Sequence, residues 1–147
     1  MKSNLITAIY CRSAIKCDDA VAAQELILRN YAEEHGYCNI AVYVDNGYNG
    51  LGFNRHAFSR LEADINAGLV GTVLVKDISR VSRNYKDIFA WFDSIRKTGV
   101  LFISVQDKLT NDFFNKEFNT MKRLLEKYHP KQKRPRKKSQ HYAAAAE

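Results

Sequence analysis

The sequence predicts an α/β fold: a mostly parallel, mixed sheet of four to five strands, flanked by helices and followed by one long helix near the carboxyl end. Three observations lead to this prediction. Short apolar, β-branched runs alternate with helical patterns, a glycine closes each of three helical patterns, and the connections are short. Such alternation favours parallel strands joined by right-handed crossovers, so we expect helices on both faces of the sheet.

The strands are predicted from apolar runs that turn polar at their carboxyl ends. The run from Thr72 to Val75 is β-branched and apolar throughout, which indicates a buried central strand. The predicted strands are residues 5–11, 40–44, 72–76 and 100–105.

Apolar residues at helical spacing predict a helix in each of the three connections between these strands. Asp18 or Asp19 is expected to cap the first helix, and Gly36, Gly68 and Gly99 are expected to end the three. The residues expected to face the core are Val21, Leu28, Tyr31 and Ala32, then Phe58, Leu61 and Ile65, then Ile88, Phe92 and Ile95.

Polar side chains follow the third strand at once. Arg80 and Arg83 are three residues apart, so a helical turn or a tight loop would direct both guanidinium groups at one anionic group. The crevice beyond the strand carboxyl ends is also where open α/β sheets bind ligands. The alternative is a solvated loop in which Arg80 pairs with Asp77.

The other strand ends carry further candidate residues. Arg12 and Ser13 follow the first strand, and a glycine-rich loop beginning at Asp45 leads from the second strand to Arg55. Because parallel strands end at one edge of the sheet, we expect these residues to converge with Arg80. Arginines without clustered carboxylates do not suit a two-metal nuclease. They suit phosphoryl transfer to an alcohol nucleophile, in which guanidinium groups stabilise the transition-state charge.

Composition narrows the class of protein. A chain of 147 residues, 46% hydrophobic and 12% aromatic, suffices for one folded domain. No run approaches the roughly 18 apolar residues of a membrane span, which predicts a cytoplasmic protein with no membrane contact. The three cysteines and four histidines show neither disulfide pairing nor metal-ligand spacing, so we expect no metal and no cofactor.

Most of the net charge of +7 lies near the carboxyl end. Residues 130–147 form a proline-broken tail that cannot bury apolar surface and is expected to be flexible. Its basic side chains suit non-specific binding to DNA phosphates, although many such tails serve only solubility. The basic residues are Lys131, Lys133, Arg134, Arg136, Lys137 and Lys138, and subtracting these six charges from +7 leaves +1 for the rest of the chain.

Residues 111–129 carry a narrow apolar stripe. Asn111 suits a helix cap, and apolar residues then recur at spacings of four and three, the pattern of a coiled-coil seam. This predicts a long helix with two open roles, a dimer interface or packing against its own sheet. The stripe consists of Phe114, Phe118, Met121, Leu125 and Tyr128.

These motifs together resemble the catalytic N-terminal domain of the serine site-specific recombinases, the resolvase and invertase family. The resemblance runs from about Ile6 to Asp107 and rests on four motifs in the family's order and spacing. They are Tyr10-Cys11-Arg12, Gln24, Asp45-x-Gly47-x-x-Gly50 with Arg55, and Ser79-Arg80-Val81-Ser82-Arg83-Asn84.

The resemblance implies a resolvase-like domain over residues 1–110, with a short antiparallel edge strand after Asp107. It implies DNA as the partner and site-specific strand exchange as the activity. In the family, a serine attacks the scissile phosphate and forms a 5′-phosphoserine link to DNA. Gln24 and Asp45 are assigned to DNA binding on the same ground. The arginines that would surround the phosphate are Arg12, Arg55, Arg80 and Arg83.

The chain departs from the family at the nucleophile. The family motif places serine two residues after the arginine that corresponds to Arg12, and here that position is Ala14. Ser13 is the nearby candidate, but it stands one residue early, and in an extended segment this shift turns the side chain to the opposite face. Where resolvase-like members carry a helix-turn-helix module, this sequence offers only its basic tail.

Two hypotheses of different classes follow. One is a DNA strand-exchange enzyme of the serine recombinase type, impaired in catalysis, with Ser13 as a displaced nucleophile. The other is a non-catalytic DNA-binding protein that pairs, as a homodimer or with a complete recombinase, through the helix at 111–128. A receiver-like signalling domain is a weaker third hypothesis, since alternating strand–helix folds host many functions. The lack of an acidic cluster beside Asp45 counts against it.

The tail generates the first testable prediction. A variant that ends at His129 is expected to lose most of its salt-sensitive affinity for arbitrary duplex DNA, because it lacks the six charges of the tail. Affinity is measured by fluorescence anisotropy across a salt series. An unchanged affinity and an unchanged salt slope would show that the tail serves only solubility.

Overall fold

The strands of the protein form one five-stranded mixed sheet. The computed structural model describes residues 4–48, 55–111 and 123. The strands are β1 (Ile6–Ser13), β2 (Ile40–Asn46), β3 (Val70–Val75), β4 (Leu101–Ser104) and β5 (Leu109–Thr110). Their order is β2-β1-β3-β4-β5, with β5 antiparallel to β4 and the other pairs parallel, so the predicted mixed sheet with an antiparallel edge strand is confirmed.

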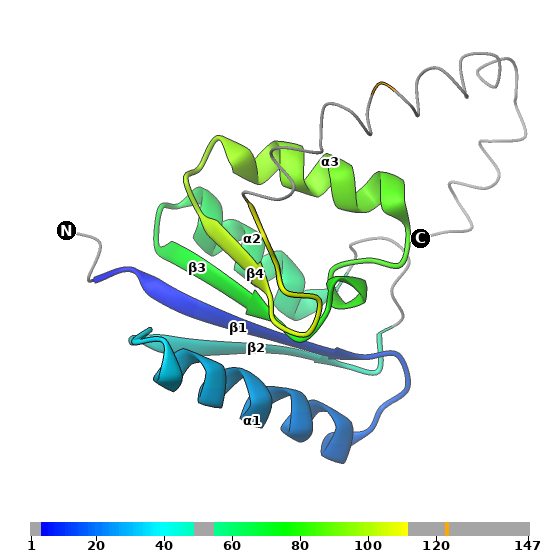
Figure 1. Ribbon diagram of the computed structural model, residues 1–147. Helices are drawn as coiled ribbons and strands as arrows, with labels where there is room; N and C mark the ends of the chain where they lie inside the picture. Colours follow the sequence, from blue (N-terminus) through cyan, green and yellow to red (C-terminus); the bar gives the residue numbers. More distant parts are fainter. Residues whose placement is uncertain (1–3, 49–54, 112–122, 124–147) are drawn as a thin grey trace, which may run out of the picture.

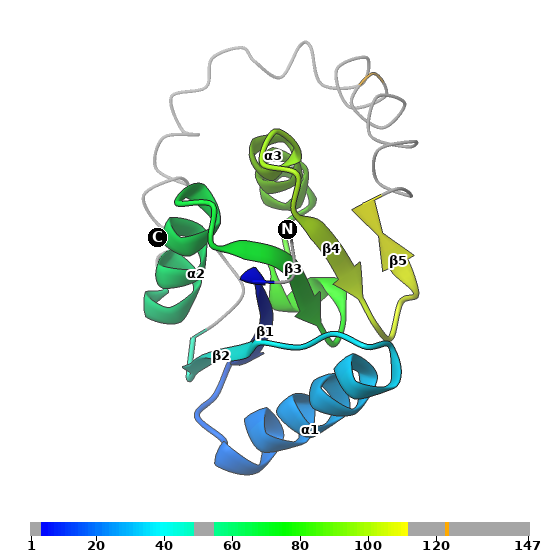
Figure 2. The same ribbon diagram turned by 90° about the vertical axis from the view of Figure 1, so that its left-hand side faces the viewer.

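Helices cover both faces of the sheet (Figure 1). They are α1 (Asp18–Glu34), α2 (His56–Asn66) and α3 (Tyr85–Arg96), and a short 3-10 turn, η2 (Ile78–Arg80), follows β3. α1 packs on one face, whereas α2 and α3 lie on the opposite face, as the view along the sheet in Figure 2 shows. The predicted helices between the strands are therefore confirmed.

β1 and β2 extend beyond their apolar runs into polar residues. Parallel pairing continues to Arg12 opposite Asp45 and Ser13 opposite Asn46, whereas we expected the strands to end at residues 11 and 44. Because these polar residues belong to paired strands, the sheet itself determines where they lie.

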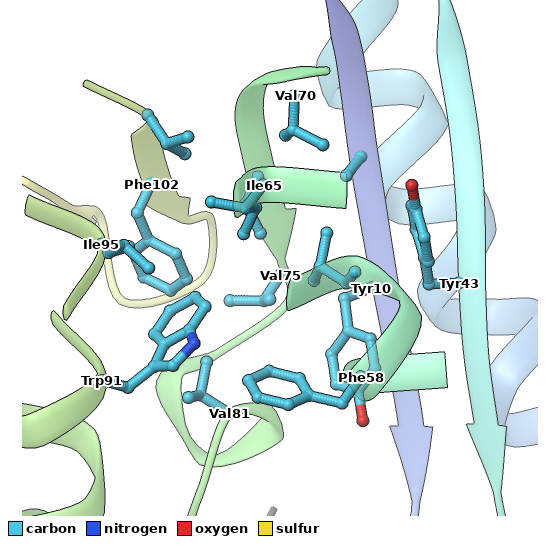
Figure 3. Packing of buried hydrophobic residues seen from close by; sticks show 14 of the residues in the cluster. Tyr10, Tyr43, Phe58, Ile65, Val70, Val75, Val81, Trp91, Ile95 and Phe102 are labelled. Atoms are coloured by element: carbon cyan, nitrogen blue, oxygen red, sulfur yellow. The ribbon is translucent and has the colours of Figure 1, made fainter. Parts of the chain in front are cut away.

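The larger core lies between the sheet and the helices α2 and α3 (Figure 3). Its aromatic rings pack edge to face: Tyr10 and Phe58 have centroids 5.3 Å apart, and Trp91 and Phe102 are 5.7 Å apart. The side chains predicted to face inward from α2 and α3 are buried, namely Phe58, Leu61, Ile65, Ile88, Phe92 and Ile95.

The smaller core lies under α1. Leu28 and Ala32 are buried as predicted, but Val21 and Tyr31 are only partly buried, and the polar Gln24 is buried instead. The predicted cap by Asp18 or Asp19 is wrong: the N-cap residue is Cys17, whose side chain makes no capping hydrogen bond, and both aspartates lie in the first turn.

Apart from Asn111 and Arg123, the helix predicted over 111–129 lies outside the described residues, and so does the tail at 130–147. The role of that helix in dimerisation and the proposed domain division stay predictions. The side-chain amide of Asn111 donates to the main-chain oxygen of Val100 at 2.8 Å and accepts from the main-chain nitrogen of Phe102. None of the helices in the described ranges has the length and apolar character that crossing a bilayer requires.

Phe102 is expected to be among the side chains that contribute most to stability. Phe102→Ala should lower the free energy of unfolding by about 3–5 kcal/mol, because it leaves a cavity beneath Trp91 and Phe92. Leu101→Ala is the matched control, since Leu101 precedes it on β4 and is 36% exposed. Urea denaturation measures both variants, and equal losses would contradict this account of the core.

Candidate functional site

The carboxyl ends of three parallel strands bring the predicted site residues to one edge of the sheet (Figure 1). Arg12 and Ser13 end β1, Asp45 lies near the end of β2, and η2 follows β3. Since β1 lies between β2 and β3, Arg12 is the central residue of this edge.

Arg12 is buried in spite of its charge, with 1% of its surface exposed. Its guanidinium donates to three main-chain oxygens: those of Arg80 at 3.1 Å, Tyr48 at 2.8 Å and Ser79 at 2.6 Å. Burial, and next the neighbouring Arg55, lower the pKa of Arg12 to about 10. The group therefore stays charged at neutral pH, and it joins the end of β2 to η2.

Arg55, which precedes α2, binds the same main-chain segment. Its terminal nitrogens donate to the oxygens of Arg80 at 3.1 Å and Val81 at 2.6 Å, and to the hydroxyl of Tyr10 at 3.2 Å. The guanidinium carbon also lies 4.5 Å from the centre of the Phe58 ring, a cation–π contact. Residues 79–81 thus accept charge-assisted hydrogen bonds from two buried arginines.

Asp45 holds α2 in place. Its carboxylate accepts from the main-chain nitrogens of Ala57 at 2.8 Å and Phe58 at 3.0 Å, so it caps α2 from the end of β2. It also accepts from the Tyr10 hydroxyl at 2.7 Å. Burial raises the pKa of Tyr10 well above its usual value, against the lowering effect of Arg55, so the phenol stays protonated and donates to Asp45.

Gln24 and Arg80 meet at the main chain of Arg12. The Gln24 amide accepts from the Arg12 nitrogen at 3.1 Å and donates to the Arg12 oxygen at 2.9 Å. Arg80 donates to the same oxygen at 3.1 Å, and its Nε lies 3.4 Å from a carboxylate oxygen of Asp77. The ion pair of the alternative interpretation is therefore present, but both side chains are largely buried within the site and do not belong to a solvated loop.

The four arginines differ in accessibility. Arg12 and Arg55 are buried, Arg80 is partly exposed and Arg83 is exposed. The structure brings Arg12, Arg55 and Arg80 together around residues 79–81, with Arg83 at the surface just beyond η2. The assignments of these arginines to a phosphate, and of Gln24 and Asp45 to DNA, stay predictions. The contacts shown for Gln24 and Asp45 hold Arg12 and α2.

Position 14 offers no nucleophilic atom. Ala14 is the first residue after β1 and is partly buried. The hydroxyl of Ser13 donates to the main-chain oxygen of Ile15 at 2.5 Å, and Ser13 is 9% exposed. Ser13 is therefore held in a local turn.

Four arginines lie at or near this edge of the sheet, two of them buried. Asp45 and Asp77 are the acidic groups among these contacts, and each accepts hydrogen bonds from neighbouring residues. Within the described ranges, no three His, Cys, Asp or Glu side chains are grouped as metal ligands. The arrangement suits binding of a phosphate group by guanidinium groups.

Comparisons with known proteins identify the family of the chain and solved structures with the same fold. A family model described as the resolvase N-terminal domain matches residues 7–147. The chain belongs to the resolvase family. This confirms the family resemblance of the sequence, and the match with the resolvase domain supports a recombinase-like function.

Solved structures with the same fold are recombinase domains. The N-terminal catalytic domain of TP901-1 integrase is 25% identical with a TM-score of 0.76, over 84% of this chain and 98% of that chain. A resolvase family site-specific recombinase from Streptococcus pneumoniae is 22% identical with a TM-score of 0.70, over 97% and 99%. The C-terminal catalytic domain of ISC1926 TnpA, an IS607-like serine recombinase, is 24% identical with a TM-score of 0.60, over 69% and 70%. The search of curated proteins gives no match.

Sequence reasoning missed two features of this site. It did not identify Asn46, whose side-chain oxygen accepts from the main-chain nitrogen of Cys17 at the start of α1. It also did not identify the main-chain oxygens of Tyr48 and residues 79–81 as the partners of the arginines. A sequence cannot show which main-chain oxygens will accept a hydrogen bond, because every residue has a main-chain oxygen. For Asn46, an asparagine directly after Asp45 was the available signal.

Arg12 is predicted to be structural as well as functional. Arg12→Lys should lower the free energy of unfolding by about 1.5–3 kcal/mol, because an ammonium group cannot reach three carbonyl oxygens in a planar fork. Arg83→Lys is the matched control, since Arg83 is exposed. Denaturant titration of both variants tests this, and a loss in Arg83→Lys as large as in Arg12→Lys would contradict it.

Proposed function

We propose that this protein is a DNA-binding, serine recombinase-like protein that acts in site-specific strand exchange but lacks a nucleophile of its own. One observation carries the proposal. The chain gathers three guanidinium groups at the carboxyl edge of its sheet, while Ala14 occupies the position at which the family motif has serine.

DNA binding is assigned to the accessible arginines. Arg80 and Arg83 lie at the surface of the site and suit direct contact with backbone phosphates, and the basic residues from Lys131 to Lys138 add non-specific attraction. Arg12 and Arg55 are buried and do not contact DNA themselves, but their charges raise the positive potential at the surface of the site. Cytoplasmic location and access to DNA are part of the same proposal.

Strand cleavage of the family type needs an alcohol oxygen at phosphorus. The serine hydroxyl gives up its proton as its oxygen bonds to phosphorus, the bond from phosphorus to the 3′ oxygen breaks, and the departing 3′ oxygen takes up a proton, so that no net proton is gained or lost. Ala14 has no oxygen to form this bond. The Ser13 hydroxyl is directed to the main-chain oxygen of Ile15. We therefore propose that a complete recombinase, paired with this chain, supplies the nucleophile.

The decisive experiment uses a duplex with a nicked, suicide recombination site. The unmodified protein is expected to bind this DNA and to give no covalent adduct on a denaturing gel. Ala14→Ser should be the single change that yields an adduct, because it restores the oxygen at the family position.

Ser13→Ala is the matched control for the displaced serine. An adduct from the unmodified chain that disappears in Ser13→Ala would overturn the proposal and establish Ser13 as the nucleophile. Absence of any salt-sensitive DNA binding by the unmodified chain would overturn the binding part as well.

A further inference from the structure

The turn that carries position 14 is tied to the end of β2. The main-chain oxygen of Ser13 accepts from the nitrogens of Gly47 at 2.8 Å and Tyr48 at 2.9 Å. Gly47 has a φ of +100°, which favours glycine and allows both nitrogens to reach one oxygen. The amino end of the turn is thereby attached to the segment after β2.

Asn46 attaches the carboxyl end of the same turn. Its Oδ1 accepts from the main-chain nitrogen of Cys17 at 2.7 Å, and its Nδ2 donates to a carboxylate oxygen of Asp18 at 2.8 Å. Cys17 is the N-cap residue of α1 and makes no capping hydrogen bond with its own side chain. Asn46 therefore supplies from β2 a bond to the amino end of α1 that the local sequence does not provide.

Only three residues, Ala14, Ile15 and Lys16, lie between these two attachments. Ala14 is also two residues after Arg12 in the chain, and the main-chain oxygen of Arg12 accepts a hydrogen bond from the Arg80 guanidinium at 3.1 Å. Two residues, Ile15 and Lys16, thus connect position 14 to the start of α1 at Cys17.

We infer that Asn46 is a positioning residue, which holds position 14 beside the arginine cluster by capping α1 from the neighbouring strand. Its relevance to strand exchange rests on the proposed function and applies to the Ala14→Ser variant, in which position 14 carries the nucleophile. The geometric claim does not need DNA, so it can be tested separately.

The test places a thiol at position 14 and measures the positive potential there. The parent carries Ala14→Cys, Cys17→Ala and Cys38→Ala. Cys11 stays, because it is buried and burial raises its pKa to about 12, so it does not react. The rate of alkylation by iodoacetate, an anion, is divided by the rate with neutral iodoacetamide. Changes in protein stability or in thiolate fraction alter both rates by the same factor, so they cancel in the ratio.

Asn46→Ala in this parent is expected to lower the ratio about threefold, because the thiol moves away from the guanidinium groups. Combining Asn46→Asp with Asp18→Asn exchanges donor and acceptor at unchanged net charge, and should restore the ratio. Asn30→Ala, on the exposed side of α1, is the matched control and should leave the ratio unchanged.

An unchanged ratio in Asn46→Ala, or a low ratio in the exchanged pair, would overturn the inference. Should Asn46→Ala fail to fold by circular dichroism, Asn46→Gln takes its place, because it keeps a neutral amide but displaces it by one methylene: a ratio below that of the parent supports the inference and an unchanged one refutes it. Failure of the DNA adduct experiment leaves these outcomes unaffected, so the two proposals fail independently.

Discussion

The burial of the Arg12 guanidinium is the interaction on which this edge of the protein depends. Moving an unpaired cation from water into a protein interior costs several kcal/mol, so the surrounding main chain must supply acceptors. Three carbonyl oxygens do so, from Tyr48 after β2 and from Ser79 and Arg80 after β3. Each acceptor must lie within hydrogen-bond distance of one planar group. The ends of three strands are therefore fixed relative to one another by a single side chain.

This arrangement separates the groups that shape the site from those that face solvent. Arg12 and Arg55 direct their nitrogens at main-chain oxygens of residues 79–81, which determines the course of η2. η2 in turn carries Arg80 and leads to the exposed Arg83. None of these contacts involves the side chain of residue 14. The framework of buried and partly exposed arginines therefore forms without a side-chain oxygen at position 14.

The sequence predicted the parts of the structure that local pattern determines. Phe58, Leu61 and Ile65 recur at helical spacing and are buried, and the alternating apolar runs identified the parallel strands. Prediction from the sequence failed where the hydrogen-bond partner of a residue is distant in the sequence. Asp18 and Asp19 looked like caps for α1, but the amide that bonds the start of that helix belongs to Asn46, on another strand. Gln24 interrupts the apolar face of α1 because it binds the main chain of Arg12, a contact that periodicity cannot reveal. The four arginines were found as motif residues, whereas their distribution between interior and surface required the structure.

The same strand pairing bears on the proposal that Ser13 does not replace a serine at position 14. Ser13 lies opposite Asn46 in the β1–β2 ladder, and Arg12 lies opposite Asp45. Sliding β1 forward by one residue would bring Ser13 to the place of Ala14, but it would turn every β1 side chain to the other face of the sheet. Cys11, which packs under α1, would then occupy the place of the buried guanidinium, and Arg12 would leave its three carbonyl partners. A one-residue slide of β1 that brings Ser13 into position thus breaks the interaction that forms the site.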